Sequence, residues 1–261
     1  MNLLEKRQQA ELIAIEAGTF AKALFLNRSS LTIESKGAQD FVTAADRDSE
    51  QIIRSRLAKA FPEDGFLGEE SGAADSHSGG IWVVDPIDGT INFTHGVRYW
   101  CISIAYWCAG EIQVGVIYDP MAEELFSAAK GMGASLNGAP IQVSTCTSVD
   151  MALCCHGYIP RHRQANNFAL RKSLFDAGAA VKDFGAGALM LAHVAAGRFD
   201  AYLEEQMHPW DAMAGYCLIR EAGGRTNTYP ADPNHIEKGG KVLAASPPIF
   251  DELQRLQQLH L

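Results

Sequence analysis

The chain has 261 residues, 47% hydrophobic and 20% charged, which excludes a disordered protein and indicates one large domain or two packed lobes. Its net charge of −9 argues against a general nucleic-acid binder and against a protein that binds anionic membranes, since either needs a basic face. An acidic protein can still bind an anionic substrate when metal ions supply positive charge.

The first half of the chain shows both helical and strand patterns. Apolar residues at helical spacing predict a helix over residues 3–26 and a second helix from Thr43 to Phe61. Thr43 is the expected N-cap of the second helix, and Asp46, three residues on, is first of all a capping residue. Apolar runs predict strands over residues 31–33, 66–68, 81–84, 97–107, 112–118 and 125–129. We expect a loop over residues 71–80 and a tight turn at Asn137-Gly138.

The second half continues the mixture without a linker or a repeat. Strands are predicted over residues 151–158, 179–184, 199–203 and 242–245. Helices are predicted over residues 165–175, 185–197, 209–222 and 248–259. We therefore expect a single domain over residues 1–261, made of two closely packed lobes, roughly residues 1–145 and 146–261.

The cysteines and the N-terminal stretch indicate the compartment. Six cysteines form neither a CxxC pair nor a zinc-ligand pattern, and adjacent Cys154 and Cys155 are expected to be small core residues. The N-terminal stretch has scattered charges and no apolar signal core, and no stretch has the apolar length of a membrane span. We expect a reduced, cytoplasmic protein without a membrane partner.

The stretch Trp82–Phe93, WVVDPIDGTINF, carries the strongest chemical signal. A predicted strand is followed by Asp85 and Asp88, three residues apart, and then by Gly89 and Thr90. Proline between the acids stiffens the backbone, and the glycine lets the backbone approach a ligand closely. Two acids followed by free amides suit a cation and a phosphate held side by side.

Two further acids stand at the ends of predicted elements. Glu69 follows an apolar run next to Glu70, and Asp211 lies in the first turn of the helix that begins at Pro209. If Glu69 and Asp211 meet the two acids of the central stretch, four carboxylates share one pocket and require neutralisation. Oxygen ligands favour Mg²⁺, with Mn²⁺ as a substitute. Two or more such ions could orient a phosphate, acidify a water and stabilise the leaving oxygen.

Other interpretations of the central stretch fit less well. An EF-hand loop that began at Asp85 would need a glutamate at its twelfth position, where the chain has Gly96. A phosphatase of the haloacid dehalogenase type would need an aspartate nucleophile where the chain has Pro86. A purely structural turn would not explain two acids, a threonine and a separate acid at a helix start together.

Three motifs in order resemble the signature regions of the inositol monophosphatase family. They are GEES at residues 68–71, WVVDPIDGTINF at residues 82–93 and WDAMAG at residues 210–215. Residues 40–46, 133–138 and 221–224 are also similar. The resemblance implies an α+β fold, a layered α-β-α-β-α sandwich of the inositol monophosphatase and sugar phosphatase type. It further implies a Mg²⁺-dependent, lithium-sensitive homodimer.

The resemblance also assigns roles in a metal and phosphate site. One metal ion would be held by Glu69, Asp85 and the carbonyl of Ile87. A second would be held by Asp85, Asp88 and Asp211, with Glu69 also near a third. The expected catalytic residues are Asp46, Glu69 and Thr90, and the expected phosphate-binding residues are Gly89 and Thr90. Water would attack directly, without a phosphoenzyme.

Substrate contacts are expected from Asp88 and from a segment opposite the central stretch. The resemblance places Glu204 at a position that contacts ring hydroxyls, and it places Gly185, Ala186 and Gly187 where the family often has Gly-Thr-Ala. Ile91, Asn92 and Phe93 differ from the Lys-Glu-Phe of 3′-phosphoadenosine phosphatases. The preferred substrate is inositol-1-phosphate or a similar polyol monophosphate, with histidinol phosphate as the rival.

A function of a different class stays open, because some bacterial relatives act through partners in RNA processing or transcription. The acidic net charge does not support nucleic-acid binding.

Overall fold

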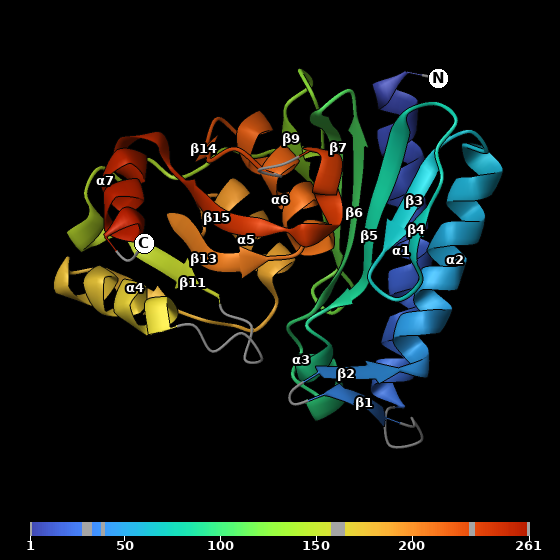
Figure 1. Ribbon diagram of the computed structural model, residues 1–261, viewed down its shortest axis with the longest axis horizontal. Coiled ribbons are helices and arrows are strands. Elements are labelled where there is room, and N and C mark those ends of the chain that lie inside the picture. The colour runs from blue at the N-terminus through green and yellow to red at the C-terminus, as the bar shows by residue number, and fades with distance from the viewer. Residues whose placement is uncertain (1, 28–32, 38–39, 158–164, 230–232, 260–261) are drawn as a thin grey trace.

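The protein is a five-layered α+β sandwich (Figure 1). The computed structural model describes residues 2–27, 33–37, 40–157, 165–229 and 233–259. Helices α1 (Leu3–Leu26) and α2 (Ala44–Ala60) cover one face of an eight-stranded sheet. Helices α5 (Gly187–Ala195) and α6 (Pro209–Glu221) lie between this sheet and a five-stranded sheet. Helices α4 (Ala165–Asp176) and α7 (Pro247–Gln258) cover the outer face of the second sheet, so the predicted α-β-α-β-α sandwich is confirmed.

The large sheet has the strand order β10-β9-β8-β7-β6-β5-β3-β4. Its strands are β3 (Gly65–Gly68), β4 (Gly72–Ala74), β5 (Gly80–Asp88), β6 (Cys101–Cys108), β7 (Glu111–Asp119), β8 (Glu124–Ala129), β9 (Ala134–Leu136) and β10 (Ala139–Pro140). All neighbours are antiparallel except β3 and β5, which run parallel. Asn137 and Gly138, with φ of 49° and 80°, form the predicted tight turn between β9 and β10.

The second sheet has the order β12-β11-β13-β15-β14. Its strands are β11 (Leu153–His156), β12 (Ala180–Lys182), β13 (Ala201–Met207), β14 (Arg225–Thr226) and β15 (Gly240–Ala245). Strand β11 runs parallel to β12 and β13, whereas the other pairs are antiparallel. The short elements are the hairpin β1 (Ile33–Gly37) and β2 (Asp40–Thr43), helix α3 (Thr90–His95) and the 3₁₀ turns Val149–Met151 and Pro233–Lys238.

The sequence-based boundaries were wrong in several places. The expected loop over residues 71–80 contains β4, whose small residues form a strand by pairing with β3 at the sheet edge. Of the strand expected at 31–33, residues 31 and 32 lie outside the described residues, and from Ile33 the strand continues to Gly37, beyond the predicted end. The strand expected to end at Leu203 continues to Met207. Strand β14 and the length of α3 were not predicted, because both are short and lack a periodic pattern.

Strand β5 shows how one strand serves two cores. Trp82 and Val84 are buried towards α1 and α2, while Val83 is buried towards α5 and α6. Regular alternation would send residues three apart to opposite faces. The ladder with β6 is irregular between Asp85 and Asp88, and both carboxylates consequently face the α6 side. The acids therefore lie within the strand, at a bulge, and not after its end at Val84 as predicted.

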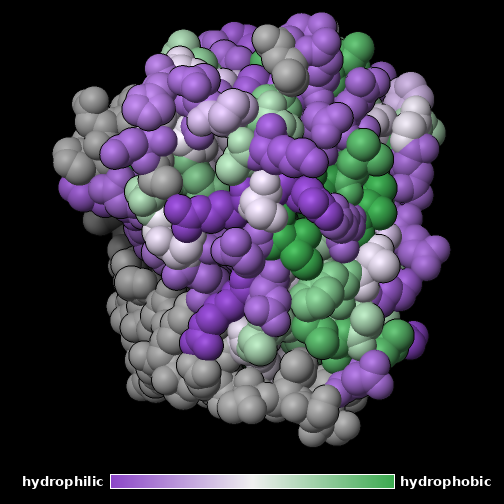
Figure 2. Space-filling view, turned by 90° about the vertical axis from the view of Figure 1, so that its right-hand side faces the viewer, coloured by the Kyte–Doolittle hydropathy of each residue, from purple (hydrophilic) through white to green (hydrophobic). Residues whose placement is uncertain are grey.

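The side of α2 that faces the solvent is polar. Its exposed residues include Arg47, Asp48, Arg56 and Lys59, whereas Ile53 and Leu57 are buried against the sheet. Figure 2 shows that hydrophilic residues prevail on this side of the molecule, with hydrophobic residues gathered in its right half. None of the described helices combines the length and the apolar character needed to cross a membrane.

A buried ion pair joins α1 to the large sheet. The Lys6 ammonium pairs with the Asp64 carboxylate, which also accepts hydrogen bonds from Trp82 Nε1 (3.0 Å) and Ser78 Oγ (2.6 Å). The same ammonium lies 3.9 Å from the centre of the Tyr106 ring. The pair therefore has charge, hydrogen-bond and cation–π partners, which offset the cost of removing it from water.

We predict that Lys6→Ala lowers the free energy of unfolding by about 3–5 kcal/mol, because it leaves the Asp64 carboxylate buried without its counter-charge. The matched control is Lys130→Ala, which removes an ion pair with Glu111 whose side chains are 52% and 55% exposed. It should change stability by less than about 1 kcal/mol. Urea denaturation followed by tryptophan fluorescence measures both, and equal effects would contradict the prediction.

Candidate active site

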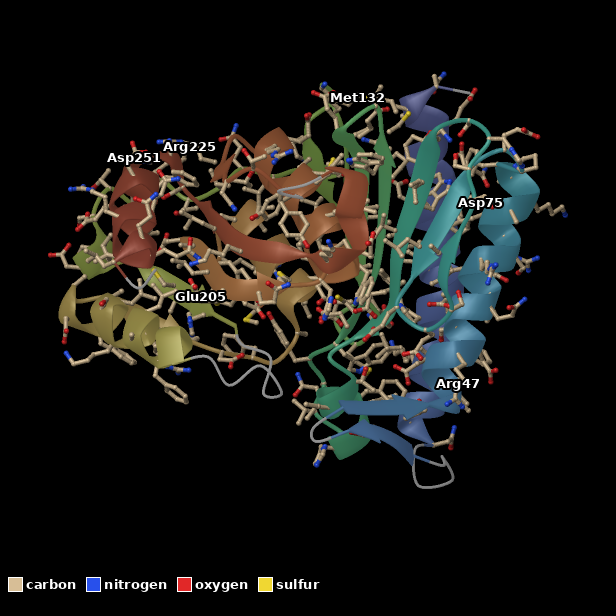
Figure 3. All side chains as sticks on the ribbon, viewed as in Figure 1. Arg47, Asp75, Met132, Glu205, Arg225 and Asp251 are labelled. Atoms are coloured by element: carbon tan, nitrogen blue, oxygen red, sulfur yellow. The ribbon has the colours of Figure 1, made fainter. Side chains whose placement is uncertain are left out.

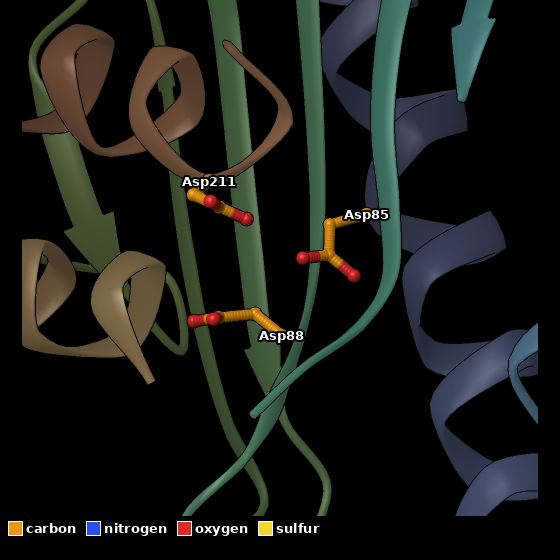
Figure 4. Close-up of side chains that lie close together, drawn as sticks. All are labelled: Asp85, Asp88 and Asp211. Carbon is orange, nitrogen blue, oxygen red and sulfur yellow. The ribbon is translucent and has the colours of Figure 1, made fainter. Parts of the chain in front are cut away.

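Three of the four predicted acids meet in space. Asp85 and Asp88 come from the bulged end of β5, and Asp211 comes from the first turn of α6. One carboxylate oxygen from each lies within 4.8 Å of the others. Figure 4 shows the three side chains pointing into a common space between β5 and α6. Such a set of oxygen atoms suits a hard divalent cation such as Mg²⁺.

Glu69, the fourth acid, lies at the end of the neighbouring strand. Because β3 is parallel to β5, the Glu69 N–H donates to the carbonyl of Val84, next to Asp85, at 3.2 Å. Glu50 of α2 fixes this turn by accepting the Glu70 N–H at 2.9 Å. A Cβ at Gly68 would stand 2.3 Å from Glu50 Oε2, so a larger residue there would displace the Glu50 side chain. The expected convergence of two strand ends is present.

The electrostatics of the cluster call for positive charge. Burial raises the pKa of Asp85 well above its usual value, and the charges of Glu69, Asp211 and Asp88 raise it further. Burial, and then the charge of Asp211, raise the pKa of Asp88 to about 7. Buried like charges disfavour one another's ionised forms, and a bound cation reverses this preference. The donor set therefore fits a metal ion better than it fits a metal-free pocket.

Asp88 also caps helix α5. Its carboxylate accepts the backbone N–H groups of Gly187 (3.2 Å), Ala188 (2.8 Å) and Leu189 (3.4 Å). The N-cap residue, Ala186, has no side-chain hydrogen bond, so the cap comes from a distant strand. The amides of Ala188 and Leu189 lower the pKa of Asp88 and partly oppose the effect of burial. Asp88 and Gly187, both predicted substrate contacts, are thus joined directly.

Gly89 and the segment around Gly185 pack against each other. Gly89 has φ of +95°, and a Cβ there would lie 3.1 Å from Ala186 Cβ and 3.3 Å from the Gly185 carbonyl. Gly185 has φ of +74°, and its N–H donates to Asp183 Oδ1 at 3.0 Å. Side chains other than glycine would be strained at both positions. The predicted phosphate-binding and substrate-binding segments are therefore neighbours.

Asp46 and Thr90 form the predicted pair. Asp46 accepts the backbone N–H and the hydroxyl of Thr43 at 2.8 and 2.7 Å, which confirms the capping box of α2. Its other oxygen accepts the Thr90 hydroxyl at 3.2 Å, and that hydroxyl also lies 3.1 Å from the carbonyl of Ile87. Burial raises the pKa of Asp46 to about 6, while the bonds from Thr43 lower it. The residue is both a cap and a neighbour of the acid cluster.

Glu204 and Glu205 project to opposite faces of β13. Glu204 is buried, accepts the Tyr202 hydroxyl, and has a pKa raised well above its usual value, mainly by burial. The charges of Asp211, Asp183 and Asp88 raise the pKa of Glu204 further. Glu205 pairs instead with Lys241 at 2.5 Å, in the part of the molecule that carries α4 (Figure 3). The geometry favours Glu204 over its neighbour.

Some residues that hold the site together were not predicted. The Asn92 side-chain amide donates to the carbonyls of Tyr99 and Phe184, each at 2.7 Å, and so ties α3 to the Gly185 segment. Glu50 supports Glu69, and the Cys101 thiol donates to Asp88 Oδ2 at 3.6 Å. The available signal was weak: Asn92 follows the Asp-Gly-Thr run directly, whereas Glu50 and Cys101 look like ordinary helix and strand residues.

Residues 4–260 match the sequence model of the inositol monophosphatase family. The chain belongs to this family. The family assignment made from the three motifs is therefore confirmed. Membership of the family indicates that the protein is a phosphatase of a metal-dependent kind.

Relatives of the chain have two kinds of name. The protein named Nus factor SuhB of Pseudomonas aeruginosa is 38% identical over 238 residues, 88% of either chain. The inositol-1-monophosphatase of Synechocystis is 38% identical over 227 residues, 85% of this chain and 79% of the relative. Among solved structures, extragenic suppressor protein suhB of Bartonella henselae has a TM-score of 0.90 at 33% identity, covering 96% of this chain and 97% of that one. Inositol monophosphatase of Anabaena has a TM-score of 0.86 at 34% identity, covering 99% and 97%.

We predict that Asp46 and Asp88 contribute stability to the metal-free protein as the pH falls, against the opposite contribution of His156 and His193, whose pKa values burial lowers to about 4. Folded pKa values of about 6 for Asp46 and about 7 for Asp88 lie above the ordinary value of 3.8. At these two carboxyl groups protons therefore favour the folded state. Their contribution to stability grows from just above pH 7 down towards pH 3.8 and is lost as the pH rises again. Thermal unfolding in EDTA, between about pH 8 and about pH 5.5, measures this dependence.

The variant Asp88→Asn should flatten the dependence, because the amide does not titrate and its oxygen can still accept bonds from α5. The control Asp251→Asn removes an exposed carboxylate paired with Arg225 (Figure 3) and should leave the dependence unchanged. An Asp88→Asn curve parallel to that of the unmodified protein would refute the assignment.

Proposed function

We propose that the protein is a Mg²⁺-dependent phosphomonoesterase that acts on inositol-1-phosphate or a similar polyol monophosphate. The observation that carries this proposal is the group formed by the buried Asp85 and Asp88 and the partly buried Asp211. Glu69 lies beside Asp85, and Gly89 directly follows Asp88. Membership of the inositol monophosphatase family supports the reaction class.

Two or three Mg²⁺ ions, or Mn²⁺ in their place, would be held by oxygen ligands. Glu69, Asp85 and the Ile87 carbonyl form one proposed set. Asp85, Asp88 and Asp211 form the other, and Glu69 also serves a weaker third ion. When bound, such ions orient the phosphate, lower the pKa of a water and offset the charge on the leaving oxygen. The raised pKa values of Asp85 and Asp88 support this proposal, because their main causes are burial and neighbouring carboxylates, and a bound cation would offset both.

The proposed proton path uses Thr90 and Asp46. The Thr90 hydroxyl holds the attacking water, and Asp46, hydrogen-bonded to that hydroxyl, is ionised above its pKa of about 6 and can accept a proton. The backbone amides of Gly89 and Thr90 bind the phosphate. Water attacks phosphorus directly, so no phosphoenzyme forms.

We assign the choice of substrate to the residues opposite β5, from Gly185 to Glu204. Glu204 accepts a ring hydroxyl, and the proposal is supported by the influence of the Asp211 and Asp88 charges on the pKa of its carboxyl group. Asp88, Gly185 and Gly187 complete the substrate side. By analogy with the family, we also propose a homodimer that is inhibited by lithium.

A second function is favoured by the names of relatives. Proteins called Nus factor SuhB, from Pseudomonas aeruginosa and Escherichia coli, are 38% and 35% identical to this chain. We accordingly propose, as the alternative, a role as a partner protein in transcription or RNA processing, with residual phosphatase activity.

Comparing turnover of inositol-1-phosphate, histidinol phosphate and fructose-1,6-bisphosphate tests the substrate proposal. Inositol-1-phosphate should have the highest kcat/KM, because Glu204 can accept a ring hydroxyl that histidinol phosphate lacks. Phosphate release with and without EDTA gives the metal dependence. A strong preference for histidinol phosphate would overturn the first choice of substrate.

Asp211→Asn should lower kcat by about a thousandfold or more, because it removes a proposed metal ligand, while the protein stays folded. Asp251→Asn, at an exposed position of α7, is the control and should keep full activity. Near-normal turnover of Asp211→Asn would remove Asp211 from the metal site. A pull-down with the same inactive variant addresses the alternative: macromolecular partners retained without activity would favour it.

A further inference from the structure

Strand β6 lies directly behind the acids of β5. In the antiparallel ladder Asp85 is opposite Ser103, and Asp88 is opposite Cys101. Both β6 side chains are completely buried. Cys101 and Ala105 belong to the core that faces α5 and α6, so alternation places Ser103 on that same face. A hydroxyl thus stands in an otherwise apolar layer, next to the acid cluster.

The Ser103 hydroxyl reaches the helix that carries the third acid. Its Oγ donates to the backbone carbonyl of Trp210 at 2.7 Å. Trp210 immediately precedes Asp211 in the first turn of α6. One hydrogen bond therefore connects the strand position opposite Asp85 to the backbone beside Asp211.

The remainder of α6 is held by close packing in its middle and by hydrogen bonds at its far end. A Cβ at Gly115 of β7 would lie 2.3 Å from the carbonyl of Ala214, so the middle of the helix rests on the strand backbone. At the far end, the Glu221 carboxylate accepts the N–H groups of Gly131 and Gly133, each at 2.8 Å. Apolar contact is non-directional, whereas a hydrogen bond fixes a distance and a direction. At the acidic end, Ser103 supplies such a constraint.

We propose that Ser103 is a positioning residue that sets the gap between Asp85 and Asp211 and thereby adapts the site to a small cation. This proposal rests on the Mg²⁺ site proposed above. Mg²⁺ requires near-octahedral ligands at about 2.0–2.1 Å, whereas Ca²⁺ accepts irregular sets at about 2.3–2.6 Å. If the distance between Asp85 and Asp211 is no longer fixed, the affinity for Mg²⁺ should fall more than the affinity for Ca²⁺.

The test is calorimetric titration of the EDTA-treated protein with Mg²⁺ alone and with Ca²⁺ alone, in the absence of substrate. Ser103→Ala should weaken Mg²⁺ binding by about three- to tenfold, the range expected for one buried hydrogen bond. It should weaken Ca²⁺ binding by less than about twofold. The matched control is Ser127→Ala on β8, which removes another buried hydroxyl of the same sheet, one that lies 3.2 Å from Ser135 Oγ. Its affinities for both ions should equal those of the unmodified protein.

Ser103→Thr keeps a hydroxyl at the position and should retain the ratio of Mg²⁺ to Ca²⁺ affinity. Thermal unfolding verifies that each variant is folded. The proposal is wrong if Ser103→Ala binds Mg²⁺ normally, if Ser127→Ala loses as much affinity, or if the threonine variant has the ratio of the alanine variant. An unmodified protein that binds neither ion would instead overturn the proposed function.

Discussion

Repulsion among buried carboxylates at the bulge of β5 is the constraint on which the surrounding structure depends. Asp85 and Asp88 are both buried and face the same side, and Asp211 approaches them from α6. The fold offsets part of this cost with neutral donors: the amides of α5 bind Asp88, and the Ile87 N–H donates to Asp85 at 2.8 Å. A bound cation can offset the rest of this cost. The cluster therefore destabilises the metal-free protein, whereas the same carboxylates favour the binding of a cation.

The same sheet separates stability from chemistry. The face towards α1 and α2 contains a large apolar core and the Lys6–Asp64 pair, which is complete within the protein. The face towards α6 contains the incomplete acid cluster. Strand β5 contributes to both, because its side chains alternate up to Val84 and the bulge then changes the pattern. A strand that is well packed on one face can in this way hold unfavourable charges on the other.

Much of this arrangement is visible in the sequence, since local patterns determine local structure. Helical periodicity located α1, periodicity and the Thr43 cap located α2, and the Asp-Gly-Thr run located the site. The bulge could not be deduced, because proline between two acids fits a turn as well as a bulge. Ser103, which links the strand position opposite Asp85 to the backbone beside Asp211, could not be predicted either. In the sequence it resembles any polar residue in an apolar strand, and its role depends on β6 lying beneath α6. The role of such a residue depends on contacts between segments that are far apart in the sequence, and local composition does not reveal these contacts.

The position of α6 has a consequence for how the molecule forms. This helix comes from the C-terminal part of the chain, yet it rests on β6 and β7, which come from the N-terminal half. The three acids therefore meet only after distant segments have docked, and contacts of this kind form slowly. A divalent cation that binds the assembled acids, and not the separate segments, would stabilise the complete fold by mass action. Cation concentration then becomes a variable of folding as well as of catalysis.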